Sequence, residues 1–275
     1  VAGRGAVEGR SRMDQIDRRH SLIKSWLHEA ADLLRESFNK ELEIKEKTSR
    51  TDLVTNMDRE IEVFLYEKIT AHFPDERILG EESVGHDIQD LDGIVWIIDP
   101  IDGTLNFIKQ RANFAIMIGI YKDGVGHLGY IYDVVRDELY FAIRDNGAYC
   151  NDRRLPRVED LPLSEGLVAI SNRLVVSDAD EARRIARNSS GLRVNGSAGL
   201  ETAWVASGKL VAYIAPSLAP WDIAAGLVIA EEVGLVYRQV TGEKINLLQN
   251  NAVIVANSFA FLEIQNEWRF IFGPH

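Results

Sequence analysis

The N-terminal part of the chain shows two helical patterns separated by a polar stretch. Between residues 13 and 39, apolar residues recur at the spacing of one helix face. Residues 37–51 are polar and charged, which predicts a loop. Residues 58–72 again place their apolar side chains on one face, so a second amphipathic helix is expected. Residues 1–12 are rich in Gly and Arg, and we interpret them as a tag remnant or a disordered tail.

The middle of the chain changes to the pattern of β-strands. Residues 94–98, Ile-Val-Trp-Ile-Ile, predict a short buried strand, and residues 78–79 predict another before it. Residues 114–121, 125–133 and 138–143 predict three antiparallel strands, because short turn sequences separate them. We therefore expect a sheet in this region.

The second half alternates strand patterns with helical patterns. Residues 151–166 hold two prolines and many charges, and we interpret them as the connection between two lobes. Strands are predicted at 167–170, 192–194, 211–215 and 253–256, and helices at 178–188, 198–207, 221–233 and from about 259. The alternation predicts a mixed α/β (α+β) fold whose strands are sandwiched between helices, with lobes of about 13–155 and 156–275.

Composition narrows the functional classes. The 275 residues are 46% hydrophobic and 27% charged, which is sufficient for a well-buried core. The net charge of −11 argues against a nucleic-acid backbone as partner, since such binding needs a basic surface. No apolar run approaches the roughly 18 residues that span a bilayer, so no membrane partner is expected. Cys150 is the only cysteine and no signal peptide is apparent, which predicts a cytoplasmic location.

Candidate chemistry begins where the predicted strand 94–98 ends. Asp99 follows it directly, and the next residue, a proline, removes a backbone donor. Asp102 comes three residues later, and Gly103-Thr104 opens a turn or short helix. Two carboxylates on a stiff turn can converge on one hard cation, and free amides at a helix start suit a phosphate. The pattern predicts neighbouring metal and phosphate sites, which metal-assisted hydrolysis requires.

Three further carboxylate positions support this interpretation. They matter because an isolated Asp-x-x-Asp pair more often caps a turn and faces solvent. The sequence Gly-Glu-Glu-Ser at 80–83 follows a short apolar strand. Asp222, in Pro-Trp-Asp, lies at a predicted helix start, and Asp58 lies at another. Each carboxylate stands at the end of an element, where functional sites are usually built.

These motifs carry a resemblance to a known family. Gly-Glu-Glu-Ser at 80–83, Asp-Pro-Ile-Asp-Gly-Thr at 99–104 and Trp-Asp at 221–222 stand in the order of the inositol monophosphatase family. The chain from about Met13 resembles this family, within the magnesium-dependent, lithium-sensitive sugar phosphatase superfamily. The resemblance implies a layered αβαβα fold with two lobes around one active site, and a homodimer.

The resemblance also implies a set of magnesium ligands. Glu81, Asp99 and the backbone carbonyl of Ile101 would hold the first Mg²⁺. Asp99, Asp102 and Asp222 would hold the second, so that Asp99 bridges the two ions. Glu81 would also lie near a weaker third ion. Two or three Mg²⁺ per active site are therefore expected.

Catalytic and phosphate-binding roles follow from the same resemblance. Asp58 and Thr104 would orient and activate the attacking water, with Glu81 as a further catalytic residue. The amides of Gly103 and Thr104 would hold the phosphate. Lys47 falls where the family has a lysine near the metal site, although a solvated lysine is the alternative.

The substrate is less closely defined. Gly196 and Ser197 match the substrate-facing loop of the family, and inositol monophosphate is the leading substrate. However, Ala215 stands where inositol-selective relatives place a glutamate that contacts ring hydroxyls. Fructose 1,6-bisphosphate, 3′-phosphoadenosine 5′-phosphate and NADP therefore remain alternatives. A different class of function, a non-enzymatic regulator bound to the transcription machinery or the ribosome, also remains open.

Overall fold

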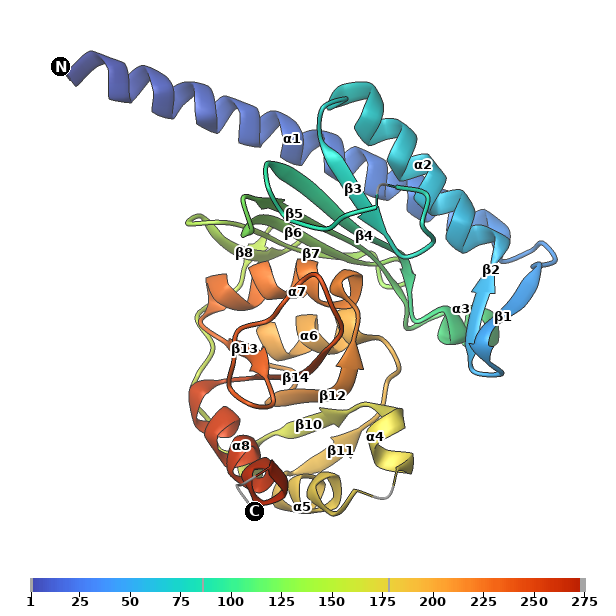
Figure 1. Ribbon diagram of the computed structural model, residues 1–275, viewed down its shortest axis with the longest axis vertical. Coiled ribbons are helices and arrows are strands. Elements are labelled where there is room, and N and C mark those ends of the chain that lie inside the picture. The colour runs from blue at the N-terminus through green and yellow to red at the C-terminus, as the bar shows by residue number, and fades with distance from the viewer. Residues whose placement is uncertain (1, 86, 178, 273–275) are drawn as a thin grey trace.

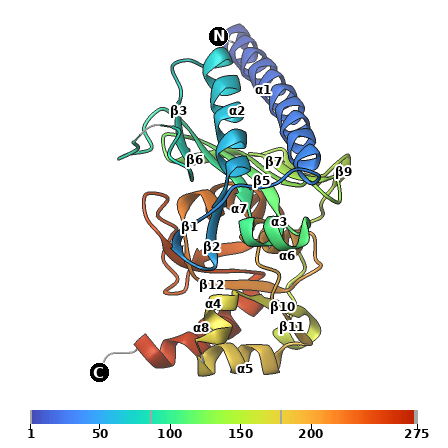
Figure 2. The same ribbon diagram turned by 90° about the vertical axis from the view of Figure 1, so that its right-hand side faces the viewer.

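The computed structural model describes residues 2–85, 87–177 and 179–272, which form five layers (Figures 1 and 2). Two long helices cover a seven-stranded sheet, two helices separate this sheet from a five-stranded sheet, and shorter helices with the C-terminal helix cover the far side. The predicted mixed α/β, layered αβαβα fold is confirmed.

The first layer consists of α1 (Ala2–Ser37) and α2 (Asn56–His72). Their apolar faces are buried on the seven-stranded sheet through residues such as Trp26 and Leu65. The predicted helix beginning near Met13 starts instead at Ala2, so residues 2–12, which we expected to be a tag remnant or disordered, are helical. This segment contains no proline, and its Ala and Arg residues have high helix propensity, although its three glycines have low propensity.

The seven-stranded sheet has the strands in chain order. They are β3 (Arg77–Gly80), β4 (Ile94–Asp102), β5 (Ala115–Lys122), β6 (Val125–Asp133), β7 (Glu138–Ile143), β8 (Gly147–Cys150) and β9 (Arg153–Arg154). β3 is parallel to β4, and the other pairs are antiparallel, as predicted for β5 to β7. β4 continues past the predicted end at Asp99, but its register with β5 shifts between Asp99 and Asp102, where Pro100 cannot donate a ladder hydrogen bond.

The second half of the chain forms the remaining layers. α6 (Ala198–Ala206) and α7 (Pro220–Val233) lie between the two sheets. The five-stranded sheet has the order β11 (Gly191–Arg193), β10 (Leu167–Ile170), β12 (Ala212–Leu218), β14 (Asn251–Ala256) and β13 (Val236–Gln239). A 3-10 turn (Leu163–Glu165), α4 (Asn172–Val176), α5 (Asp180–Asn188) and α8 (Ser258–Phe272) complete this lobe. No helix in the described ranges is long and apolar enough to cross a membrane.

Several elements differ from the sequence prediction. β8, β9 and α4 were not predicted, and β9 lies in the segment 151–166 that we expected to be a connection. The predicted loop 37–51 contains β1 (Ile44–Ser49), which pairs with β2 (Asp52–Thr55) in a separate two-stranded sheet. All six residues of β1 are exposed, so no alternation of apolar and polar residues revealed this strand. β13 was also missed, and it pairs with β14 at the edge of the five-stranded sheet.

Candidate active site

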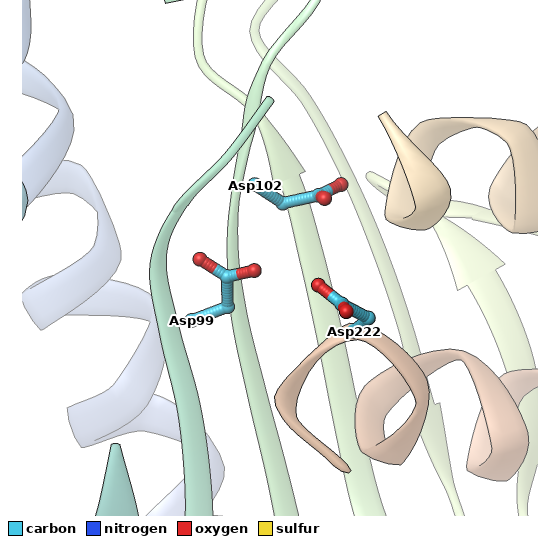
Figure 3. Close-up of side chains that lie close together, drawn as sticks. All are labelled: Asp99, Asp102 and Asp222. Carbon is cyan, nitrogen blue, oxygen red and sulfur yellow. The ribbon is translucent and has the colours of Figure 1, made fainter. Parts of the chain in front are cut away.

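The predicted carboxylates converge where several element ends meet. Asp99 and Asp102 lie at the end of β4, and Asp222 lies in the first turn of α7 (Figure 3). The three side chains point toward one another, and each offers a carboxylate oxygen within 4.8 Å of the others. Strand β4 belongs to the seven-stranded sheet and α7 to the layer beneath it, so the cluster joins two layers of the fold.

Each carboxylate of this cluster is held by backbone amides. The Ile101 amide donates to Asp99 Oδ1 at 3.1 Å. The Ala219 amide donates to Asp222 Oδ2 at 2.8 Å, which fixes the start of α7. The Gly199 amide and the Ser197 hydroxyl both donate to Asp102 Oδ2, the amide at 2.7 Å. The carboxylates are therefore fixed in position before any ligand arrives.

Burial and mutual repulsion disfavour the charged forms of these groups. Burial is the main reason that the pKa of Asp102 rises to about 6 and that of Asp222 to about 8. Burial, followed by repulsion from Glu81, Asp102 and Asp222, raises the pKa of Asp99 well above its ordinary value. Such a cluster favours a ligand that brings positive charge.

A second group of hydrogen bonds joins Asp58 to Thr104, the first residue of α3 (Thr104–Gln110). Asp58 lies in the first turn of α2, and its Oδ2 accepts from the amide and the hydroxyl of Thr55, both at 2.7 Å. Its Oδ1 accepts from the Thr104 hydroxyl at 2.8 Å. The same hydroxyl is 3.0 Å from the carbonyl oxygen of Ile101. Burial raises the pKa of Asp58 to about 6.

Glu81 lies beside the cluster, on the loop after β3. Burial raises its pKa, while Lys47 opposes this rise. Lys47 lies on β1, and its Nζ donates to Glu81 Oε1 at 3.0 Å and also to Glu82. Burial alone would lower the pKa of Lys47, but the two glutamates raise it above its ordinary value. Lys47 is thus an exposed residue whose ammonium group is ion-paired with both glutamates.

The start of α3 lies against the loop before α6. Gly103 precedes α3 with φ of 91°, a conformation that favours glycine. A Cβ at Gly103 would lie 3.2 Å from the Gly196 carbonyl oxygen and 3.4 Å from Ser197. The predicted phosphate-binding and substrate-facing residues are therefore neighbours, although they are far apart in sequence.

Ala215 does not line this cluster with a polar group. It pairs with Val253 in the middle of the five-stranded sheet, and its side chain is fully buried in the core. β12 becomes irregular between Ala215 and Leu218, where Pro216 and Ser217 are partly exposed. The strand thus offers no carboxylate at the position of the expected glutamate.

Sequence reasoning missed three residues that hold the site loops. Asn106 donates to the Asn195 carbonyl at 2.7 Å, which joins α3 to the loop before Gly196. Glu201 accepts from the Asn195 amide at 2.9 Å. Glu62 accepts from two amides of the loop that carries Glu81. Of these three, Glu201 had a signal in the sequence, because it is the single charged residue within the apolar helix predicted at 198–207.

Comparison with known proteins agrees with this geometry. Residues 17–269 match the model of the inositol monophosphatase family. The chain is 44% identical to an inositol-1-monophosphatase of Bacillus subtilis, over 86% of this chain and 91% of the relative. It is 31% identical to a fructose-1,6-bisphosphatase/inositol-1-monophosphatase of Thermotoga maritima, over 88% and 91%. It is 38% identical to the Nus factor SuhB of Pasteurella multocida, over 68% and 71%.

Solved structures give the same result. A staphylococcal inositol monophosphatase (SaIMPase-II) with bound inositol monophosphate superposes with a TM-score of 0.83 at 35% identity, covering 93% of this chain and 96% of that one. An IMPase/NADP phosphatase complexed with Mg²⁺ and phosphate has a TM-score of 0.85 at 30% identity, covering 93% and 95%. A staphylococcal inositol monophosphatase-1 in an inhibitory LiCl complex also has a TM-score of 0.85 at 30% identity, covering 92% and 94%.

The motifs, their convergence in space and the match over nearly the whole chain point to one conclusion. The chain belongs to the inositol monophosphatase family and is a phosphoric monoester hydrolase.

Proposed function

We propose that this chain hydrolyses inositol monophosphate, with Mg²⁺ as its cofactor and water as the attacking group. The observation that carries the proposal is the convergence of Asp99, Asp102 and Asp222 beside the hydrogen bond from Thr104 to Asp58. Carboxylate and carbonyl oxygens are the ligands that Mg²⁺ prefers. A bound cation would also relieve the repulsion among these buried carboxylates, so this donor set fits the metal.

The ligands divide between two metal positions. Glu81, Asp99 and the Ile101 carbonyl would hold one Mg²⁺, and Asp99, Asp102 and Asp222 would hold another. A third, weaker ion is expected beside Glu81. Bound Mg²⁺ lowers the pKa of a coordinated water and stabilises negative charge on the leaving oxygen.

Asp58 and Thr104 would remove a proton from the attacking water. Both hydrogen bonds from Thr55 go to Asp58 Oδ2, so Oδ1 is left for the Thr104 hydroxyl. A hydroxyl that donates to a carboxylate keeps its lone pairs for a second partner. Thr104 Oγ1 can therefore accept a proton from water and pass its own to Asp58 Oδ1. A pKa of about 6 suits Asp58 as a proton acceptor near neutral pH.

Substrate contacts would come from both lobes. The amides of Gly103 and Thr104 would donate to the phosphate, and Gly196 and Ser197 would face the rest of the substrate. Support for inositol monophosphate comes from the name of the Bacillus subtilis relative and from the staphylococcal complex. Ala215 supplies no acceptor for a ring hydroxyl, which favours a broad specificity.

That departure supports a second candidate substrate. A relative that covers most of this chain is an IMPase/NADP phosphatase, and another is a fructose-1,6-bisphosphatase/inositol-1-monophosphatase. NADP and fructose 1,6-bisphosphate are therefore proposed as alternatives, with 3′-phosphoadenosine 5′-phosphate. The Nus factor relative supports a non-enzymatic role in transcription as a separate alternative.

The test is phosphate release by the purified chain from inositol 1-phosphate, NADP and fructose 1,6-bisphosphate, each with and without Mg²⁺. We expect Mg²⁺-dependent release, fastest from inositol 1-phosphate. Faster release from NADP would replace the leading substrate and keep the reaction. No release from any ester would contradict the enzymatic proposal and favour the regulator. That role would further require a cellular function retained by Asp102→Asn.

Three further properties are proposed: lithium inhibition, a homodimeric state and a cytoplasmic location. Lithium would inhibit by competing for a Mg²⁺ position, as the inhibitory LiCl complex of a staphylococcal relative supports. The active form would be a homodimer in the cytoplasm. Inhibition curves at several Mg²⁺ concentrations and sedimentation equilibrium test the first and the second of these proposals.

A further inference from the structure

A buried glutamate outside the carboxylate cluster holds the loop that carries Glu81. Glu62 lies on α2 and is 0% exposed. Its Oε2 accepts the Glu82 amide at 2.7 Å, and its Oε1 accepts the Val84 amide at 2.8 Å. The two oxygens of Glu62 thus accept hydrogen bonds from the amides of the first and the third residue after Glu81.

The loop is folded closely around this carboxylate. A Cβ on Gly80 would collide with the carboxylate of Glu62, so the residue before Glu81 is one without a side chain. The Ser83 amide donates to the Gly80 carbonyl at 3.3 Å, and Ser83 has φ of 59°. The carboxylate of Glu62 therefore fills the space beside Gly80, where the turn to Ser83 begins.

Glu81 is held from two sides by these contacts. Its own amide donates to the Ile98 carbonyl of β4 at 3.3 Å, and the next amide donates to Glu62. The backbone of Glu81 is therefore fixed between β4 and α2. Its side chain remains directed to Lys47 and to the neighbouring Asp99.

A buried carboxylate is an unfavourable way to fill space, because removing it from water costs free energy. Packing alone would be better served by an apolar side chain of similar volume. The geometry of Glu62 has a different use, because its two oxygens accept hydrogen bonds from two amides of the partly buried loop that carries Glu81. Groups that orient a metal ligand in this way commonly change metal affinity by 10- to 100-fold when they are removed.

We propose that Glu62 is a positioning residue that fixes Glu81 for Mg²⁺ binding. This inference rests on the proposed function, since it requires Glu81 to be a metal ligand. Glu62 does not touch the metal or the substrate, and it acts through the loop backbone. Its loss should therefore weaken Mg²⁺ binding more than it slows the reaction at saturating Mg²⁺.

The experiment is isothermal titration of Mg²⁺ into the intact chain, together with the Mg²⁺ concentration for half-maximal phosphate release. Gln at position 62 keeps only one acceptor oxygen, so Glu62→Gln should weaken Mg²⁺ binding by about 10-fold and Glu62→Ala by up to about 100-fold. Gly80→Ala should weaken it as well, because the added methyl group displaces the same carboxylate from the loop side. Glu60→Gln is the matched control, since Glu60 is exposed on the same helix.

The outcomes separate the inference from the proposed function. Wild-type chain that binds no Mg²⁺ would contradict the proposed metal site itself. Wild-type binding together with unchanged Mg²⁺ affinity in Glu62→Gln and Gly80→Ala would overturn the positioning role, even if the melting temperature fell. Weakened affinity with kcat at saturating Mg²⁺ within about threefold of wild type would support it, provided that Glu60→Gln behaves as wild type.

Discussion

Different kinds of groups come to the proposed site from residues up to 155, called here the N-terminal lobe, and from residues after 155, called the C-terminal lobe. The N-terminal lobe supplies carboxylates, among them Asp99 and Asp102, whose pKa values are raised by burial. The C-terminal lobe adds Asp222, but most of its contribution consists of donors and backbone shape. The Ser197 hydroxyl and the Gly199 amide both donate to Asp102. Asp102, a buried carboxylate of the N-terminal lobe, thus accepts hydrogen bonds from a loop of the C-terminal lobe.

This difference separates chemistry from selectivity. The carboxylates and the hydrogen bond from Thr104 to Asp58 match what hydrolysis of any phosphate monoester needs. In our proposal the loop at 195–197 would face the remainder of the substrate, and the family resemblance places Ala215, which is buried, where inositol-selective relatives carry a glutamate. Substitutions in the N-terminal lobe should therefore affect all substrates alike, whereas those in the C-terminal lobe should change their order.

The largest effect on turnover is expected from Asp99→Asn, which removes a carboxylate of the N-terminal lobe. Asp99 is the proposed ligand of both Mg²⁺ ions, so turnover should fall by more than about 100-fold with every substrate. The fold should persist, because removal of one of several repelling carboxylates relieves repulsion in the metal-free chain. Phosphate release and the melting temperature without Mg²⁺ are the measurements.

The exposed Asp152 provides a control for this substitution, and Asp152→Asn should behave as wild type. Substantial turnover in Asp99→Asn would remove Asp99 from the metal site. An unfolded Asp99→Asn chain would show that this carboxylate is needed for the fold, which would contradict its assignment to the metal site alone.

A somewhat smaller loss is expected from Thr104→Ala. The substitution removes the hydroxyl that donates to Asp58, and a positioned proton acceptor contributes at least about 100-fold to a rate. The Mg²⁺ concentration for half-maximal activity should change little, since no side-chain ligand is lost. Thr104→Ser keeps the hydroxyl and should recover most of the rate. An unchanged kcat in Thr104→Ala would exclude the hydroxyl from water activation.

Ser197→Ala tests the contact between the lobes and should have an intermediate effect. Its hydroxyl donates to Asp102 and accepts the Leu200 amide, which caps α6. Loss of such a cap costs about 1 kcal/mol, or about 2–4 °C in melting temperature. We expect kcat/KM to fall by about 10-fold, because the Gly199 amide still holds Asp102. Equal losses for inositol 1-phosphate and NADP would contradict a substrate-facing role for this loop.

The same contrast explains what the sequence could reveal. Carboxylates at the ends of apolar strands or at helix starts, such as Asp99, Asp222 and Asp58, are visible because each follows a pattern change. Their convergence could be inferred only from the family resemblance. The antiparallel strands of the seven-stranded sheet were predicted for the same reason, since turns separate apolar runs.

Features that depend on contacts distant in the chain could not be predicted in this way. β1 is exposed along its whole length, so it has no apolar periodicity. Glu62 and Asn106 act on backbone groups of other elements, 20 and 89 residues away, and such partners leave no local pattern. The helical start at Ala2 could not be predicted, because residues 2–12 contain three glycines of low helix propensity and show no apolar periodicity.

The smallest effect on turnover is expected from Glu201→Gln, which removes a buried carboxylate of the C-terminal lobe. Glu201 is buried on α6 and accepts the Asn195 amide at 2.9 Å. Burial raises its pKa to about 7, against an ordinary value of 4.5. Between these two values the folded chain holds a proton that the unfolded chain has released, so the free energy of unfolding must fall as pH rises.

This sign predicts a pH-dependent difference between variant and wild type. A glutamine resembles the protonated glutamate and keeps an acceptor for Asn195, so both chains should have similar melting temperatures at about pH 5. Above about pH 7 the wild type carries a buried charge, and Glu201→Gln should then be the more stable chain. Thermal melts between pH 5 and 8 measure the difference, with the exposed Glu159→Gln as control. A difference that stays constant across this range would mean that Glu201 does not titrate there, which would contradict a raised pKa for this carboxylate of the C-terminal lobe.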